Sequence, residues 1–205
     1  MEKHSLVTEE IITFFNRCAP NWDRDMIRDD EVIGKILTLG GVRQGVKVLD
    51  VACGTGVLIP DYLEREVDSV LGVDISPKMI EIAESKFLDE RVKFLCDDIY
   101  KMETGEKFDC IVVYNAFPHF DDPEGLVSQL AGMLVPGGAL TIAHGMSREM
   151  INRHHEGAAS HVSKGLMDVE SLTAIFSDYL TVKTKISDDR MYQVTGVKER
   201  TGKTT

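Results

Sequence analysis

Cysteine and positive charge are both scarce in this sequence. Its four cysteines, at positions 18, 53, 96 and 110, form no CxxC pair, and three of them lie in apolar or glycine-rich stretches. A free cysteine there behaves as a small hydrophobic side chain, so we expect a reducing, cytoplasmic environment. Lysine and arginine number 23 against 34 aspartates and glutamates, which gives a formal net charge of −11. This sign argues against binding to nucleic acid or to an anionic membrane surface.

Long apolar runs are also missing. No stretch approaches the roughly 18 apolar residues that a membrane-spanning helix needs, and no basic amino-terminal segment is followed by an apolar stretch and a cleavage site. We therefore expect a soluble protein that is neither exported nor inserted into a membrane. The 205 residues, 43% of them hydrophobic, suffice for one globular domain with a substantial core.

Short apolar, β-branched runs alternate with helical patterns from residue 46 onward. Strands are expected at 46–51, 69–74, 91–96, 108–114 and 138–144, and helices at about 57–67, 76–88, 123–134 and 168–178. Such alternation is typical of a mostly parallel sheet with helices on both faces. Two closing strands, 179–187 and 191–199, flank the turn "DDR" and must pair antiparallel. The expected fold is α/β and Rossmann-like, with seven strands and an antiparallel last strand.

Residues 1–42 show a different pattern. The stretches "LVTEEIITFFNRCA" and "DDEVIGKILTLGGV" carry apolar residues at helical spacing before the first strand. They are expected to form a helical amino-terminal cap that packs over the sheet or beside it. We place the boundary after residue 42, with residues 43–200 forming a single compact unit.

The stretch "VLDVACGTGVL" has the pattern of a strand, a glycine-rich turn and the start of a helix. Gly54 and Gly56 let backbone amides approach a ligand closely, as in nucleotide-binding turns. The dinucleotide fingerprint GxGxxG would need a third glycine where this chain has Ile59, which weakens an NAD-binding interpretation. Asp50 and Asp74 end the first two strands, at one edge of the sheet. Two acids beside a glycine turn suit a cationic ligand with a ribose diol.

Four motifs within residues 46–144 resemble, in the same order, those of the class I S-adenosylmethionine-dependent methyltransferases. They are "DVACGTG", "GVDIS", "CDDI" and "LVPGGAL". The resemblance implies that S-adenosylmethionine is the cofactor. The residues it implies for cofactor binding are Asp50, Ala52, Gly54, Gly56, Asp74, Ile75, Asp97, Asp98, Ile99 and Asn115.

The same resemblance assigns parts of the cofactor to particular residues. Asp50 and the Gly54–Gly56 backbone would hold the methionine portion, and Asp74 would take the ribose hydroxyls. Asp97 would meet the adenine amino group, with Ile99 against the ring. Ala52 stands at a position where the family commonly has glycine.

The amino-terminal stretch "FFNRCAPNWDRD" resembles a segment of the ubiquinone and menaquinone biosynthesis methyltransferases. By that resemblance Trp22 and Asp23 would close over the cofactor or the methyl acceptor. Packing of Phe14, Phe15 and Trp22 on the sheet would explain the same residues, so both interpretations stay open.

Three of the six histidines fall in "AHGMSREMINRHHEG", residues 143–157. His144 ends the fifth expected strand, and a helix capped by Ser147 is expected to follow it. Adjacent helical residues diverge by about 100°, so only one of His154 and His155 faces the pocket. Ile151 lies on the same face as His155, which favours His155.

His119, in "NAFPHFDDP", follows the fourth expected strand at the same sheet edge. We expect His119, His144 and His155 to converge on the acceptor side of the cofactor. They are the candidate catalytic residues, as a general base with its neighbours, and also the candidate ligands of a divalent metal. A polar lid without a chemical role is the third interpretation.

The sequence thus predicts an S-adenosylmethionine-dependent methyltransferase acting on a small-molecule acceptor. One alternative is an NAD-dependent oxidoreductase, which the missing third glycine and the presence of Asp97 oppose. The other is a regulatory protein that binds the cofactor without turnover. Neither charge nor aromatic content separates a quinone precursor from a thiol, an amine or a metalloid.

Overall fold

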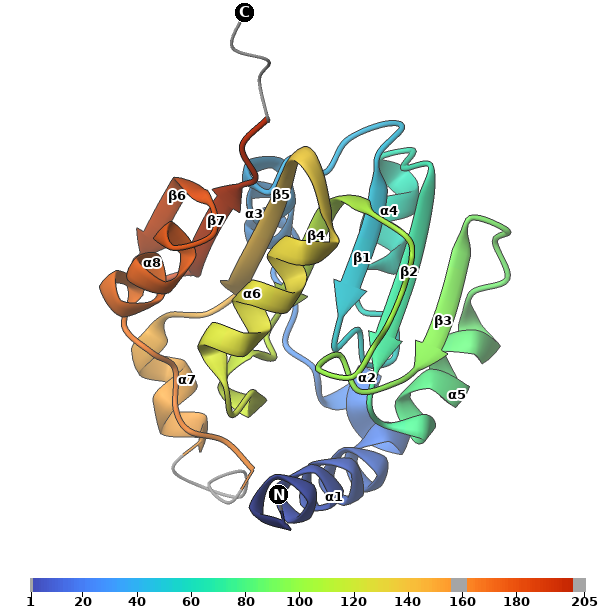
Figure 1. The fold of residues 1–205 in the computed structure, drawn as a ribbon. Helices are drawn as coiled ribbons and strands as arrows, with labels where there is room; N and C mark the ends of the chain where they lie inside the picture. Colours follow the sequence, from blue (N-terminus) through green and yellow to red (C-terminus); the bar gives the residue numbers. More distant parts are fainter. Residues whose placement is uncertain (1, 156–161, 201–205) are drawn as a thin grey trace, which may run out of the picture.

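Within the residues that the structure describes, seven strands form one central sheet (Figure 1). The computed structural model describes residues 2–155 and 162–200, with the side chains of 8–153 and 162–200. The strands are β1 Lys47–Val51, β2 Ser69–Asp74, β3 Val92–Cys96, β4 Phe108–Tyr114, β5 Leu134–His144, β6 Thr181–Ser187 and β7 Tyr192–Val197. Their order is β3-β2-β1-β4-β5-β7-β6, and β7 runs antiparallel to both neighbours. The predicted mostly parallel sheet with an antiparallel last strand is confirmed.

Helices cover both faces of this sheet. They are α1 Glu2–Cys18, α2 Trp22–Asp25, α3 Asp30–Leu39, α4 Ile59–Glu64, α5 Pro77–Lys86, α6 Pro123–Met133, α7 Arg148–His155 and α8 Val169–Ser177, with the 3-10 helices η1 Ala19–Asn21 and η2 Phe117–His119. In Figure 1, α6 and α8 lie on one face and α3 and α4 on the other. Successive side chains of β1 point to opposite faces of the sheet, and both faces are buried. Val48 therefore packs with α3 and α4 in one core, and Leu49 packs with α6 and α8 in the other.

Side-chain caps determine where several helices begin. Ser76 accepts a hydrogen bond from the Met79 amide (3.2 Å) at the start of α5, and Ser147 accepts one from the Met150 amide (3.3 Å) at the start of α7. Both predicted caps are confirmed. Aspartates cap α3, α6 and α8 in the same way. Each such cap contributes about 1 kcal/mol to stability.

Two element boundaries differ from the expected ones. Helix α4 begins at Ile59 because the two preceding residues still belong to the glycine-rich turn, and it ends at Glu64. Strand β5 begins at Leu134 instead of 138, with a register shift against β4. A Cβ on Gly138 would lie 3.0 Å from three backbone carbonyl oxygens. This glycine therefore lets the strand pass close to its neighbour at the irregularity.

The amino-terminal helices do not all lie in one place. Helix α3 shares the buried core with the sheet through Ile33 and Leu37. Helix α1 instead lies beyond the carboxyl ends of β1 and β2, the edge at which parallel α/β sheets bind ligands (Figure 1). The division of the chain after residue 42 stays a prediction. Across the described residues, no helix combines the length and apolarity needed to cross a membrane.

Candidate functional site

A cavity opens at the carboxyl edge of the sheet, between α1 and the strand ends. Its walls come from the amino-terminal segment, the turn after β1, the end of β2, the loop after β3, and the end of β4 with η2. Nine of the ten predicted cofactor residues line it: Asp50, Ala52, Gly54, Asp74, Ile75, Asp97, Asp98, Ile99 and Asn115. Gly56 does not line this cavity.

The turn after β1 depends on left-handed backbone conformations. Ala52, Gly54 and Gly56 have φ angles of 56°, 56° and 83°, a region that glycine adopts without strain and alanine does not. A Cβ on Gly56 would lie 2.6 Å from the Phe87 ring. Gly56 therefore has a packing role, while Gly54 brings bare backbone to the cavity wall.

Asp74 connects the end of β2 to the glycine-rich turn. One of its carboxylate oxygens accepts a hydrogen bond from the Gly54 amide (2.9 Å), and the other accepts one from the Ser76 amide (2.8 Å). Burial raises the pKa of Asp74, although these amide donors oppose the increase. The carboxylate thus fixes the turn as well as facing the cavity.

Asp50, at the end of β1, is a buried acid with an unmet hydrogen-bonding capacity. Its Oδ2 atom has no hydrogen-bond partner among the described residues. Burial raises the pKa of Asp50 to about 8; the Tyr62 hydroxyl opposes this increase, and the charges of Asp74 and Asp61 add to it. A cationic group in the cavity would stabilise the ionised carboxylate.

The loop after β3 places two carboxylates and an apolar side chain on the cavity wall. Asp97 accepts a hydrogen bond from the Asp98 amide (2.8 Å). Asp98 accepts one from the Tyr100 amide (3.1 Å) and forms an ion pair with Lys101 (2.9 Å). Ile99 is buried. Asp97 is therefore the acid of this loop that a ligand donor can engage without displacing a salt bridge.

Asn115 joins the ends of β4 and β5. Its backbone has a φ of 54°, and its amide donates to the Ala143 carbonyl (2.9 Å). Its side-chain oxygen accepts a hydrogen bond from the Gly145 amide (2.9 Å). These bonds hold the strand ends together where Asn115 borders the cavity.

The amino-terminal segment forms the outer wall of the cavity. Ile11 and Phe15 of α1 line it, together with Trp22 and Met26. The Phe15 ring packs edge-on against Trp22, with ring centroids 5.7 Å apart. A Cβ on Gly54 would lie 3.6 Å from the Trp22 indole nitrogen. Trp22 thus lies over the glycine-rich turn, as expected if this segment closes over a ligand.

Polar contacts tie this segment to the turn and to α5. Asp23 accepts hydrogen bonds from Thr55 (2.5 Å) and Lys86 (2.7 Å). Burial raises the pKa of Asp23, but the hydrogen bonds from Lys86 and Thr55 outweigh this effect and hold the pKa below its ordinary value. The side-chain oxygen of Asn16 accepts a bond from the Ser76 hydroxyl (2.8 Å). The segment is therefore attached to both βα turns that face the cavity.

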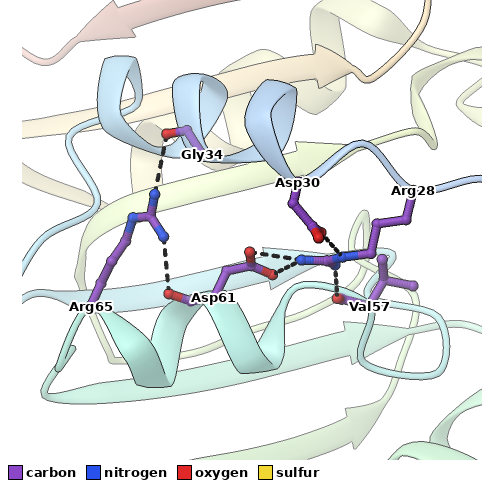
Figure 2. Close-up of polar contacts among 6 residues, drawn as sticks. All are labelled: Arg28, Asp30, Gly34, Val57, Asp61 and Arg65. Carbon is purple, nitrogen blue, oxygen red and sulfur yellow. Dashed lines mark hydrogen bonds and ion pairs between the residues drawn. The ribbon is translucent and has the colours of Figure 1, made fainter.

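Arg28 anchors the connection between α2 and α3 (Figure 2). Its guanidinium donates to both Asp61 oxygens (2.7 and 2.6 Å), to the Val57 carbonyl (2.8 Å) and to Asp30 (2.6 Å). The Asp61 side chain is only 10% exposed, and Arg65, the residue that follows α4, donates to the Asp61 carbonyl. Arg28 thus neutralises a nearly buried carboxylate beside the glycine-rich turn.

We expect Arg28→Met to lower the free energy of unfolding by about 1–3 kcal/mol, because Asp61 would be left without its charged partner. Arg190→Met is the matched control, since Arg190 also pairs with two acids, Asp29 and Glu31, but at exposed positions. Exposed pairs contribute at most about 1 kcal/mol. Urea unfolding measures both variants, and equal losses would contradict the special role of Arg28.

Of the predicted catalytic histidines whose side chains are described, His119 lies in the cavity wall. Its Nδ1 atom is 2.8 Å from the Val162 carbonyl oxygen, and its ring packs edge-on against Phe15, with centroids 5.0 Å apart. A carbonyl oxygen can only accept a hydrogen bond, so Nδ1 carries the hydrogen and Nε2 is the basic nitrogen. The ring is thus held in one tautomer and one orientation.

Of the other two predicted catalytic histidines, His144 is not brought to this wall. His144 is buried at the end of β5, does not line the cavity, and packs edge-on against Tyr192, with centroids 6.1 Å apart. Pairing of β5 with β7 accounts for this position, because it places His144 opposite Tyr192. His155 ends α7, and its side chain lies outside the described residues. The expected convergence of three histidines is therefore not seen for His144.

The helix that carries His155 has the expected inner face. Ile151 is buried and Met150 is 42% exposed. The side-chain oxygen of Asn152 accepts a hydrogen bond from the Leu166 amide (2.7 Å), so this residue holds a loop instead of facing a ligand. Among the described side chains, no group of three or more His, Cys, Asp or Glu is arranged to hold a metal ion. A metal site that includes His155 stays a prediction.

Several cavity residues were not predicted from the sequence. They are Thr8, Ile11, Met26, Tyr100, Tyr114, Phe120 and Asp121, among others. Ile11 and Phe15 are spaced four apart and so share one face of α1, which is a signal available in the sequence. Nothing in the sequence indicates which part of the sheet that face covers.

Comparison with known proteins agrees with this geometry. A family model described as a methyltransferase domain matches residues 48–138. The malonyl-[acyl-carrier protein] O-methyltransferase of Acetivibrio thermocellus is 32% identical over 132 residues, which cover 63% of this chain and 47% of that protein. A ubiquinone biosynthesis O-methyltransferase of Coxiella burnetii is 31% identical over 100 residues, 47% of this chain and 42% of that protein. The chain thus spans about half the length of these relatives.

A solved structure supports the same fold over most of the chain. The N-methyltransferase NodS from Bradyrhizobium japonicum, in complex with S-adenosyl-L-homocysteine, has a TM-score of 0.71 at 20% sequence identity. The likeness covers 91% of this chain and 97% of that chain. The methyltransferase domain match over residues 48–138, the strand order and the glycine-rich turn flanked by Asp50 and Asp74 thus agree with the resemblance to the class I S-adenosylmethionine-dependent methyltransferases, whose fold the chain shares.

Proposed function

We propose that this protein transfers the methyl group of S-adenosylmethionine to a small-molecule acceptor. The observation that carries the proposal is the composition of one cavity: aspartates and the glycine-rich turn line one part, and Phe15, Phe120 and His119 line another. The relative described as a ubiquinone biosynthesis O-methyltransferase is consistent with an acceptor of this kind.

The chemistry of the lining residues fits the cofactor. The buried Asp50 carboxylate, with an oxygen that lacks a partner among the described residues, suits the ammonium of the methionine portion. Asp74 suits the ribose hydroxyls, and Asp97 suits the adenine amino group with Ile99 against its ring. S-adenosylmethionine supplies an electrophilic methyl group already activated by the sulfonium. The protein is left to align the acceptor, exclude water and take up a proton.

His119 is the proposed proton acceptor. The hydrogen bond from Nδ1 to the Val162 carbonyl leaves Nε2 as the basic nitrogen, and Phe15 holds the ring edge-on. The amino-terminal segment with Trp22 covers the same cavity and would keep water from the reacting groups. Neither role requires a divalent metal, and a metal at His119, His144 and His155 stays a separate prediction.

The alternatives from the sequence have less support. An NAD-dependent oxidoreductase would need a glycine in place of Ile59, whose side chain is fully buried in the core at the start of α4. A regulatory protein that binds the cofactor without turnover would have no use for a basic nitrogen fixed beside the cavity.

The direct test is release of S-adenosylhomocysteine from S-adenosylmethionine in the presence of hydroxyl, thiol, amine and metalloid acceptors, with and without divalent metals. We expect acceptor-dependent release with at least one class. Tight binding of the cofactor with no release for any class would contradict the enzymatic proposal and favour the regulatory alternative.

A further inference from the structure

The cavity has a strong charge imbalance. Five aspartates line it, namely Asp50, Asp74, Asp97, Asp98 and Asp121, and none of the described lining residues is a lysine or arginine. S-adenosylmethionine carries a sulfonium, an ammonium and a carboxylate, a net charge of +1. Its binding therefore leaves the cavity with excess negative charge.

The nearest cations offset only part of this imbalance, because they pair with two of the five aspartates. Lys101 pairs with Asp98 (2.9 Å) from a side chain that is 76% exposed, and Lys164 pairs with Asp121 (3.0 Å) from one that is 64% exposed. Lys164 also donates to the Asp121 carbonyl (3.1 Å). Both lysines therefore sit outside the cavity and are engaged by its own acids. An anionic acceptor would meet carboxylates in a partly desolvated space without a compensating cation.

The part of the lining outside the cofactor motifs is apolar and aromatic. It includes Ile11, Phe15, Met26 and Phe120. Phe15 stands edge-on to the imidazole of His119, so the basic group is flanked by a ring. Such walls favour a flat, apolar molecule, because aromatic rings bury much surface and pack well edge-to-face.

From this combination we infer that the acceptor is an uncharged aromatic compound with a hydroxyl group, methylated at oxygen, and that acceptors bearing a carboxylate or phosphate are rejected. The inference rests on the proposed function. The hydroxyl proton goes to Nε2 of His119 while the O–CH3 bond forms and the S–CH3 bond breaks, yielding S-adenosylhomocysteine; the proton then leaves to solvent. An alkyl ammonium would suit the aspartates, but it would have to lose a proton before its nitrogen could attack the methyl group.

The test uses a matched pair: 4-methylcatechol and 3,4-dihydroxybenzoate share the ring and both hydroxyls and differ in a methyl against a carboxylate. Release of S-adenosylhomocysteine should show a kcat/KM about tenfold or more higher for 4-methylcatechol. Asp121→Asn should reduce the ratio of the two kcat/KM values, because the substitution removes one carboxylate from the cavity and leaves Lys164 without its acidic partner. Glu124→Gln, an equal charge change at an exposed position outside the cavity, should not.

A second readout does not need turnover. Calorimetric titration of both compounds into protein loaded with S-adenosylhomocysteine should show tighter binding of 4-methylcatechol. A preference for the carboxylate, or methylation confined to thiols or amines, would overturn the inference and leave the proposed function intact. No release with any acceptor class would count against the proposed function itself.

Discussion

Replacing His119 by alanine is expected to slow methyl transfer about 100- to 10,000-fold, the usual contribution of a general base. The expected reason is the loss of the basic Nε2 atom, whose position depends on the bond from Nδ1 to Val162 and on the packed Phe15 ring. Single-turnover measurement of S-adenosylhomocysteine formation separates this effect from product release. The residual rate should rise with pH, since the acceptor hydroxyl then ionises without a base.

A comparison with His144→Ala distinguishes the two histidines. His144 lies outside the cavity lining and packs on Tyr192, so its loss should affect stability more than the rate of methyl transfer. The folded fraction of both variants is checked by thermal unfolding. A larger loss of rate in His144→Ala than in His119→Ala, with both variants folded, would contradict the assignment of the base.

Asp50→Asn is expected to stabilise the ligand-free protein and to weaken cofactor binding. The pKa of Asp50 is raised by burial to about 8, above its ordinary value of 3.8. The contribution of Asp50 to stability is therefore fully present below pH 3.8 and is lost as the pH rises toward 8. Asparagine does not ionise, so the free energy of unfolding of the variant should not fall with pH in this way. At pH 8 the variant should be more stable than the wild-type protein by about 1–2 kcal/mol.

The same carboxylate should make cofactor affinity depend on pH. Because the ammonium of the methionine portion favours the ionised form, the wild-type protein must release a proton from Asp50 on binding below pH 8. Affinity should therefore increase with pH and level off above 8. Asp50→Asn should lose about 1.5–3 kcal/mol of binding, and its affinity should no longer vary over this range.

Calorimetry in two buffers of different ionisation enthalpy measures this proton release directly. The expected value is close to one proton per wild-type chain at pH 7 and close to none in Asp50→Asn. Equal, pH-independent affinities of the two proteins would show that Asp50 does not meet the cofactor.

The strands and most helices could be predicted because their signals are local. Strand β1 is buried on both faces after the exposed Lys47, so the rest of "KVLDV" is apolar except for Asp50. Ser76 and Ser147 marked helix starts through their capping preference. The start of β5 was not predicted, because its register shift depends on close packing of Gly138 against β4, a contact between distant residues.

In the candidate site, too, features set by local sequence could be predicted, and features set by contacts between distant residues could not. The aspartates at strand ends were predictable because parallel strands place their carboxyl ends at one edge. His144 also ends a strand there, but pairing of β5 with β7 sets it opposite Tyr192 instead of in the cavity. The position of α1 over the site depends on side-chain contacts such as Asn16 with Ser76, 60 residues apart. No periodicity in the sequence encodes such a contact.

The central claim, that this cavity binds S-adenosylmethionine, is tested most directly by isothermal titration of the cofactor into the purified protein. We predict one site per chain, binding weakened by about 1–3 kcal/mol in Asp74→Ala, and no binding of NAD. Binding of NAD without S-adenosylmethionine, or an affinity for the cofactor that Asp74→Ala leaves unchanged, would contradict this account.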